Sequence, residues 1–295
     1  MKIILAESAG LCEGVRSAVT RAEELSASVP HGVCTLGPLV WDTALQRDLA
    51  SQGVEPIKHP GEAGDRPLVL PLYGTSPEIR TTLKEDGQEI VDCTCPVVAR
   101  FLAEVRTAVR SGRRVIIFGD PEDPETQLAL SLTQKNGIVV NSPDQIMQIP
   151  EGTPITLVGQ TTADRLKFET VAAAVQTRWI RANVRYTLCP AAWAKQEEVR
   201  RLCGEVDAMV VIGDWQSANV RRLVEIARER GRKVSWVRDA TELRRDFFHG
   251  VQIVGVSSGT AVPDRLITGV IRVLKMFDRE DSIVSDQVTN QQEFE

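Results

Sequence analysis

Three of the six cysteines recur at similar intervals, and each stands directly before a helix-length segment. They are Cys12, Cys95 and Cys189, 83 and 94 residues apart, in GLCEGVRSAVTRAEEL, CTCPVVARFLAEVRTAV and TLCPAAWAKQEEVRRL. The dipole and the free N–H groups at a helix start stabilise anions, so a cysteine there is more readily a thiolate. The three thiols are therefore candidate metal ligands.

Three thiolates can bind three irons of a [4Fe–4S] cluster and leave the fourth iron without a cysteine ligand. That iron is a Lewis acid that can take an oxygen ligand, and the cluster can also supply electrons. Zinc is the weaker alternative, because a zinc site usually adds a fourth ligand at short spacing, which is not seen here. We interpret Cys34 and Cys203 as small buried apolar residues. Cys93 is too close to Cys95 to bind the same cube and is predicted to support the site.

Short β-branched runs alternate with amphipathic stretches of helical length, which predicts an α/β fold with parallel strands. Strands are expected at residues 3–6, 67–72, 114–119, 137–140, 154–159, 208–213, 233–237 and 252–257. Helices are expected near residues 13–26, 41–52, 97–110, 125–134, 163–178, 191–204, 217–229 and 263–276.

An internal repeat underlies this alternation. Three passages share the order strand, glycine turn, helix, glycine and strand, and each is followed by a second strand with a small polar turn. The turn glycines are Gly37, Gly119 and Gly213 in the passages and Gly74, Gly159 and Gly259 after them. We predict three similar α/β units at residues 12–95, 96–189 and 190–277, the third including an N-terminal strand in residues 1–11, and a polar tail at 278–295. A three-fold arrangement would bring the three thiols to one point.

Composition limits the partners. The net charge of -5 gives no broad basic surface, so nucleic acid is not expected. No apolar run approaches the roughly 20 residues of a membrane span, and the four apolar residues after Lys2 are too few for a signal peptide. We therefore expect a cytoplasmic protein, in a compartment where disulfides are rare and cysteines serve metals or catalysis.

Several segments resemble the LytB family, the 4-hydroxy-3-methylbut-2-enyl diphosphate reductases of the non-mevalonate isoprenoid pathway. They are LAESAGLCEGVRSAV, VDCTCP, DPEDPET, VGQTTAD, LCPAAWAKQ, QSAN and SSGTAVPDRL, spread over about residues 2 to 277. The resemblance implies a trefoil of three α/β units around a central cavity, with a [4Fe–4S] cluster on Cys12, Cys95 and Cys189. It also implies a small-molecule substrate and an external electron donor of the ferredoxin or flavodoxin type.

The substrate side departs from the family pattern. Family members bind the diphosphate with histidines in HN, AHG and HPE motifs, whose places are taken here by Trp41-Asp42, Tyr73-Gly74 and Asp123-Pro124-Glu125. The three histidines of this chain, His31, His59 and His249, fall outside these motifs and are interpreted as surface or loop residues. The family's Ser-Ser-Asn appears as Ser217-Ala218-Asn219, and its later phosphate-binding serine matches Ala261.

These changes predict a cavity rebuilt for a less anionic ligand with an apolar or aromatic portion, because Asp42 and Asp123 would repel a diphosphate. The expected substrate-binding residues are Trp41, Tyr73, Asp123, Ser217, Asn219 and Ala261. By the resemblance, Glu125 delivers protons to a leaving hydroxyl and Thr161 supports that relay. Burial would raise the pKa of Glu125 and suit it to this role. The alternative is that Glu125 only caps the helix that begins there.

Four functions follow. The first is reductive dehydroxylation of a substrate other than the usual diphosphate. The second is a non-redox dehydratase or a sulfur-transferring enzyme at the open iron. The third is a true diphosphate reductase that binds the anion through other groups, such as backbone N–H groups at helix starts. The fourth is a non-enzymatic redox sensor, against which the retained Glu125 and Thr161 argue.

Overall fold

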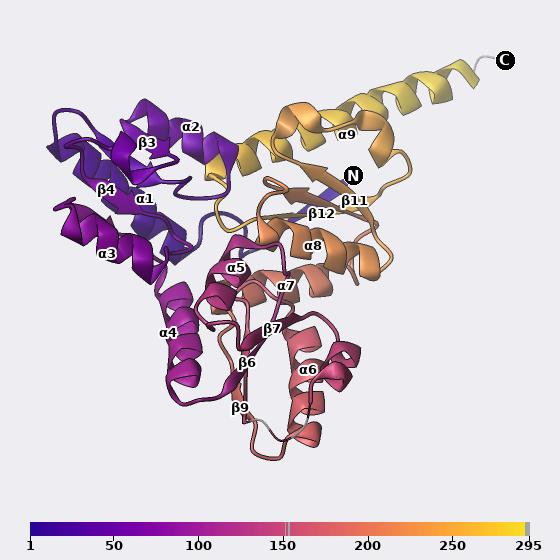
Figure 1. Ribbon diagram of the computed structural model, residues 1–295. Helices are drawn as coiled ribbons and strands as arrows, with labels where there is room; N and C mark the ends of the chain where they lie inside the picture. The colour runs from indigo at the N-terminus through magenta and orange to yellow at the C-terminus, as the bar shows by residue number, and fades with distance from the viewer. Residues whose placement is uncertain (151, 153, 293–295) are drawn as a thin grey trace. The chain divides into compact units, whose positions relative to one another are not determined.

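The computed structural model describes residues 1–150, 152 and 154–292 (Figure 1). Within this part of the chain the strands form three four-stranded sheets, and every strand pairing is parallel. The helices are α1 (Glu13–Ser28), α2 (Thr43–Ser51), α3 (Pro77–Glu85), α4 (Pro96–Arg110), α5 (Pro124–Ser131), α6 (Arg165–Arg178), α7 (Pro190–Leu202), α8 (Ala218–Glu229) and α9 (Asp264–Gln292). The predicted α/β class with three similar parts is confirmed.

The three sheets have the same strand order. Sheet I runs β3-β2-β4-β5, sheet II runs β7-β6-β8-β9 and sheet III runs β11-β10-β12-β1. The strands are β1 (Lys2–Leu5), β2 (Val33–Leu36), β3 (Val54–Ile57), β4 (Leu68–Leu70), β5 (Ile90–Asp92), β6 (Arg114–Phe118), β7 (Gly137–Val140), β8 (Ile155–Gly159), β9 (Asn183–Arg185), β10 (Ala208–Ile212), β11 (Lys233–Val237) and β12 (Ile253–Ser258). The N-terminal strand β1 thus takes the edge position in sheet III that β5 and β9 take in the other two.

This edge position explains the spacing of the cysteines. In each sheet the edge strand is followed by a cysteine and then by a helix: β1 by Cys12 and α1, β5 by Cys95 and α4, β9 by Cys189 and α7. The three thiols therefore occupy equivalent places in a repeated structure. Strands β5 and β9 were not predicted, because each has only three residues and no apolar run.

The chain forms two compact bodies. The first contains Met1–Leu11 and Ala194–Glu295 with sheet III, and the second contains Cys12–Trp193 with sheets I and II. Cys12, Cys95 and Cys189 all belong to the second body. The division into three units with borders at Cys95 and Cys189 stays a prediction.

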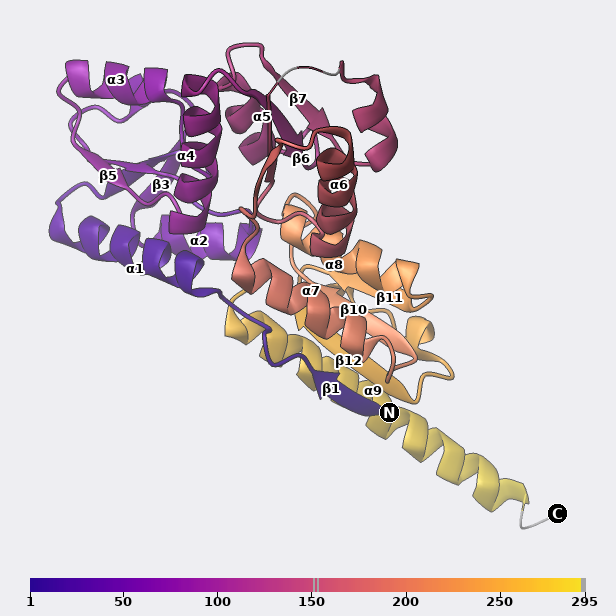
Figure 2. The ribbon, with the colours of Figure 1, turned by 90° about the horizontal axis from the view of Figure 1, so that it is seen from below.

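Apolar helix faces cover the sheets. The central strands β8 and β10 are buried at every residue, as expected for parallel strands covered on both faces. Helix α4 lies against sheet II (Figure 1). It packs there through the buried residues Phe101, Leu102 and Val105. Helix α1 lies against sheet I, in contact with β2 and β3 (Figure 2).

The last helix is longer than predicted. Helix α9 was expected to end near residue 276 but continues to Gln292, so most of the predicted polar tail is helical, and residues 293–295 lie outside the described residues. The chain has neither glycine nor proline after Gly269, which leaves no stop signal for the helix. In the part of the chain that the structure describes, no helix is both long enough and apolar enough to span a membrane.

Candidate functional site

The three thiols stand at helix starts. Cys12 and Cys95 are the N-cap residues of α1 and α4, and Cys189 directly precedes α7. The backbone carbonyl of each accepts a hydrogen bond of 2.8 to 2.9 Å from the residue four positions on. The side chains of Cys12 and Cys95 make no capping hydrogen bond, so their sulfur atoms remain available as ligands.

The three thiols also lie close together. A methyl group in place of the Gly14 side-chain hydrogen would lie 3.1 Å from the Cys95 Sγ and 4.0 Å from the Cys12 Sγ. Burial raises the pKa of Cys189, backbone N–H groups of α7 oppose this, and the negative charges of Cys12 and Cys95 raise it further. Cys189 is therefore within electrostatic reach of both other thiols, and Gly14 leaves space between two of them.

The three thiols are the donor set that the predicted cluster requires. Among the described residues, no group of three or more His, Cys, Asp or Glu side chains is arranged to hold one metal ion. A single zinc ion holds each sulfur at about 2.3 Å, whereas a four-iron cube takes one thiolate at each of three corners. Three thiols from three helix starts suit the corners of a cube.

Two thiols are tied to the polar turns that follow β4 and β8. The Cys95 N–H donates to the Leu72 carbonyl at 2.9 Å, and the Cys189 N–H donates to the Thr161 carbonyl at 2.8 Å. The repeat therefore places the same backbone contact in sheets I and II. It also places Tyr73, the next residue after Leu72, and Thr161 beside the proposed ligands.

Glu125 is joined directly to this turn. It is buried, with 7% of its surface exposed, and its two carboxyl oxygens accept hydrogen bonds of 2.7 Å from the Thr161 N–H and hydroxyl. Burial raises the pKa of Glu125 to about 7, although the two bonds from Thr161 oppose the rise; the Asp123 charge adds to it. Near neutral pH the carboxyl group therefore exists in both protonation states, as a general acid requires.

The two aspartates at the altered family positions cap helices, and their predicted place beside the ligand stays a prediction. Asp123 is buried and accepts a hydrogen bond of 2.9 Å from the Glu125 N–H at the start of α5. Asp42 does the same for α2, accepting from the Leu45 N–H at 2.9 Å. Asp123 is thus the N-cap of α5, and the carboxyl group of Glu125 instead accepts hydrogen bonds from Thr161. The sequence signal was present, since aspartate before a helix is a preferred cap.

Trp41 and Tyr73 form an aromatic pair. Their ring centroids are 5.3 Å apart and the planes differ by 19°, so the rings are stacked. Burial raises the pKa of Tyr73 to about 12, so its phenol stays protonated and can donate a hydrogen bond. Its hydroxyl lies 2.6 Å from where a Cβ on Gly37 would stand, and Gly37 has a φ of 75°. Only glycine suits that turn beneath the ring.

The remaining predicted site residues belong to the first compact body. Ser217 caps α8, accepting from the Val220 N–H at 3.5 Å. Asn219 is 2% exposed, and neither its side-chain oxygen nor its nitrogen has a hydrogen-bond partner within the described residues. A buried amide without partners is costly, so Asn219 is a candidate ligand contact. Ala261 is buried.

Two residues that the sequence reasoning missed hold the loop before Cys12. The Lys195 ammonium donates to the carbonyls of Ser8 and Gly10, the latter at 3.1 Å. Glu198 accepts from the N–H groups of Glu7 and Ser8 at 2.5 and 2.9 Å and from the Ser8 hydroxyl. Burial opposes ionisation of Glu198, but these hydrogen bonds outweigh it and lower its pKa. Helix α7 thus fixes the backbone that leads to the first thiol.

The other cysteines and the histidines match their expected places. Cys34 and Cys203 are buried, and burial raises the pKa of both thiols. Cys93 is also buried, with its pKa raised by burial, and its supporting role stays a prediction. All three histidines are exposed in loops and turns.

Comparison with known proteins gives one consistent result. The family model described as LytB protein matches residues 3–275. The 4-hydroxy-3-methylbut-2-enyl diphosphate reductases of Geotalea uraniireducens and Citrifermentans bemidjiense are each 32% identical to this chain over 281 residues, covering 95% of this chain and 99% of the relative.

Two solved structures are also similar. The E-1-hydroxy-2-methyl-but-2-enyl-4-diphosphate reductase of Plasmodium falciparum matches with a TM-score of 0.88 over 92% of this chain and 87% of its own, at 19% identity, and shows the same fold. A second structure, of an (E)-4-hydroxy-3-methyl-but-2-enyl diphosphate reductase, matches with a TM-score of 0.66 at 31% identity, over 94% of this chain and 100% of its own.

Gly14 provides a test of the thiol site. We expect Gly14→Ala to stabilise the metal-free fold by up to about 1 kcal/mol, because alanine favours a helix. The same methyl group crowds two thiols, so the variant should lose iron to a chelator about tenfold faster. Ser17→Ala, at an exposed position of the same helix, is the matched control and should lose iron at the normal rate. Equal rates in both variants would contradict the site.

Glu125 provides a test of the buried acid. Its pKa in the folded chain is raised above that of the unfolded chain, so ionising it costs stability as pH rises from about 4.5 to about 7. We expect this carboxyl to remove about 3 kcal/mol of unfolding free energy over that window, a loss that Glu125→Gln should not show. Denaturant unfolding at a series of pH values measures it. Glu122→Gln, exposed in the same loop, should show the same decrease of unfolding free energy with pH as the wild type. If Glu125→Gln also showed the wild-type decrease, Glu125 would not be the buried acid with the raised pKa.

Proposed function

Because residues 3–275 match the LytB model and relatives are 32% identical over nearly the whole chain, this chain belongs to the LytB family, and we propose that it is a [4Fe–4S] reductase. Its substrate in this proposal is less anionic than the diphosphate named for its relatives, and the reaction removes a hydroxyl group reductively. The observation that carries the proposal is the contact of Thr161 with both Glu125 and Cys189, which joins a buried acid to a candidate cluster ligand.

The cofactor proposal rests on the thiols and on the family. LytB proteins generally bind a [4Fe–4S] cluster, and Cys12, Cys95 and Cys189 would hold it here through three of its irons. When bound, the cluster supplies electrons and one iron that can take an oxygen ligand. All six cysteines are free thiols, which suits the reducing cytoplasm predicted for the protein.

The reaction consumes an alcohol, two electrons and two protons, and yields the dehydroxylated product and water. Electrons come from an external one-electron carrier of the ferredoxin or flavodoxin type. Glu125 holds a proton near neutral pH, and the Thr161 hydroxyl can accept and donate one, so the pair can move a proton to the leaving oxygen. A non-enzymatic sensor would have no use for this pair, which disfavours that alternative.

The substrate end favours a neutral group over a diphosphate. The stacked Trp41 and Tyr73 offer an apolar face and one neutral donor where family members have histidines. A helix start is the usual alternative site for a phosphate. Here the carboxylates of Asp42 and Asp123 already occupy first-turn N–H groups of α2 and α5 and would repel an anion. We therefore rank true diphosphate reduction below reduction of a neutral or singly charged alcohol.

Restoring the family histidines tests this proposal. We expect the anaerobically purified protein, supplied with a chemical reductant, to reduce a neutral allylic alcohol with a higher kcat/KM than the matching diphosphate. Trp41→His/Tyr73→His should raise kcat/KM for the diphosphate about tenfold and lower it for the alcohol. Trp41→Phe/Tyr73→Phe is the matched control, which keeps the apolar face and gains no cation.

Two outcomes would contradict the proposal. If the wild-type protein reduced the diphosphate with a kcat/KM above about 10⁴ M⁻¹s⁻¹, the ordinary enzyme range, the substrate claim would be wrong. If turnover of the alcohol needed no reductant, the protein would be a lyase.

A further inference from the structure

We propose that the face formed by α4 and the edge strand β9 is the docking surface for an acidic electron-carrier protein. The inference rests on the proposed function, because only a protein with a redox cofactor needs such a carrier. It goes further by assigning the surface and the charge of the partner.

The first observation is the concentration of positive charge in two segments. Residues 96–114 and 178–189 contain eight arginines and one acidic residue, in a chain whose acidic residues outnumber its basic ones by 40 to 35. The arginines are Arg100, Arg106, Arg110, Arg113, Arg114, Arg178, Arg181 and Arg185, and the acid is Glu104. Four of these arginines, Arg100, Arg110, Arg181 and Arg185, are exposed. The net charge of the whole chain predicted no broad basic surface, and it does not reveal this local concentration of arginines.

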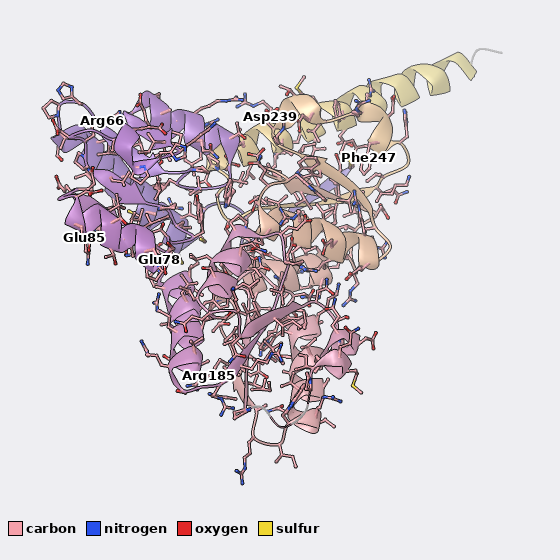
Figure 3. The ribbon with its side chains drawn as sticks, in the orientation of Figure 1. Arg66, Glu78, Glu85, Arg185, Asp239 and Phe247 are labelled. Carbon is pink, nitrogen blue, oxygen red and sulfur yellow. The ribbon has the colours of Figure 1, made fainter. Side chains whose placement is uncertain are left out.

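The second observation is that these segments form one continuous face. Three contacts join them in register: Arg100 donates to the Tyr186 carbonyl at 3.1 Å, Glu104 accepts from Arg185 at 3.0 Å, and Arg113 donates to the Arg181 carbonyl at 2.8 Å. Strand β9 is the edge of sheet II, and α4 packs on the same sheet. Figure 3 shows Arg185 on this side of the second body, near α4.

The third observation is the route from this face to the thiols. Helix α4 begins directly after Cys95, and β9 leads through Tyr186 to Cys189, three residues further on. Tyr186 is 56% exposed, yet its ring is held edge-on against Phe168 at 5.3 Å. Both elements of the face therefore lead into candidate cluster ligands. A carrier bound at the Arg100–Tyr186 end would bring its own cofactor near the cluster, and an exposed, fixed tyrosine is a common contact in such interfaces.

Charge complementarity selects the partner. A basic face attracts an acidic protein over a long range, which gives fast association and a weak, salt-sensitive complex. This behaviour suits a carrier that delivers one electron, is itself oxidised by one electron, and must leave. Two such encounters supply the two electrons of one turnover. Nucleic acid is also negatively charged, but nucleic-acid binding would not explain why both elements of the basic face lead to candidate cluster ligands.

Charge reversal tests the surface. The variant is Arg100→Glu/Arg110→Glu. Both arginines are exposed on α4, and neither forms an ion pair within the residues that the structure describes. The control is Arg228→Glu/Arg230→Glu at the exposed end of α8, which changes the net charge of the chain equally. Each cluster-loaded protein is mixed with a reduced acidic ferredoxin at about 50 mM salt, and separately with dithionite. Reduction is followed by absorbance, and ferredoxin binding is measured by calorimetry.

We expect the α4 variant to bind ferredoxin about tenfold more weakly and to be reduced by it about tenfold more slowly than the wild type. Dithionite should reduce all three proteins at one rate, because it needs no docking surface. Raising the salt to about 200 mM should slow the reduction of the wild type by ferredoxin and hardly change the rate for the α4 variant. Glu104→Gln, which removes the acid from the face, should bind ferredoxin more tightly.

The results that would contradict the docking surface differ from those that would contradict the proposed cluster enzyme. Unchanged ferredoxin binding in the α4 variant, or an equal loss in the α8 control, would overturn the docking surface. Tighter binding of a short duplex DNA than of ferredoxin at about 150 mM salt would identify a nucleic-acid surface and also overturn it. Failure of dithionite to reduce any of the proteins would instead reject the proposed cluster enzyme, and the docking inference with it.

Discussion

The central contact of the second body is made by Thr161. Its carbonyl accepts the N–H of Cys189, while its own N–H and hydroxyl hold the two carboxyl oxygens of Glu125. One residue thus fixes the position of a thiol and the environment of a buried acid. Burial sets the pKa of Glu125 to about 7, and the contact with Thr161 keeps this buried carboxyl hydrogen-bonded in either protonation state. The proposed proton chemistry and the proposed cluster ligation by Cys189 therefore both depend on the turn after β8.

The repeat explains why such a turn lies beside a thiol. Each sheet ends in an edge strand that is followed by a cysteine and a helix, and in sheets I and II the cysteine N–H is bonded to the turn after the neighbouring strand. In sheet III the edge strand is β1, so the first thiol comes from the start of the chain. Lys195 and Glu198 then hold the loop that leads to Cys12.

Much of this was readable from the sequence because it is local or repeated. The helix starts at Cys95 and Cys189 are marked by Pro96 and Pro190, and the central strands are continuous apolar runs. The clamp of Lys195 on Ser8 was not readable, because it joins residues 187 positions apart without a local pattern. Asp42 and Asp123 were judged by charge alone, although their places before helices already favoured capping. The α4–β9 face was missed because charge was summed over the whole chain.

We infer that the protein has a retained end and an altered end. In this inference the thiols, Glu125 and Thr161 keep the family pattern, whereas the positions that match the family's anion-binding histidines by resemblance carry an aromatic pair and a capping aspartate. The most direct test is Mössbauer spectroscopy of anaerobic protein enriched in ⁵⁷Fe. We predict three thiolate-bound irons and one distinct iron, whose signal changes when a neutral allylic alcohol is added and not when the diphosphate is added. Absence of a distinct iron, or a response to the diphosphate alone, would contradict this prediction.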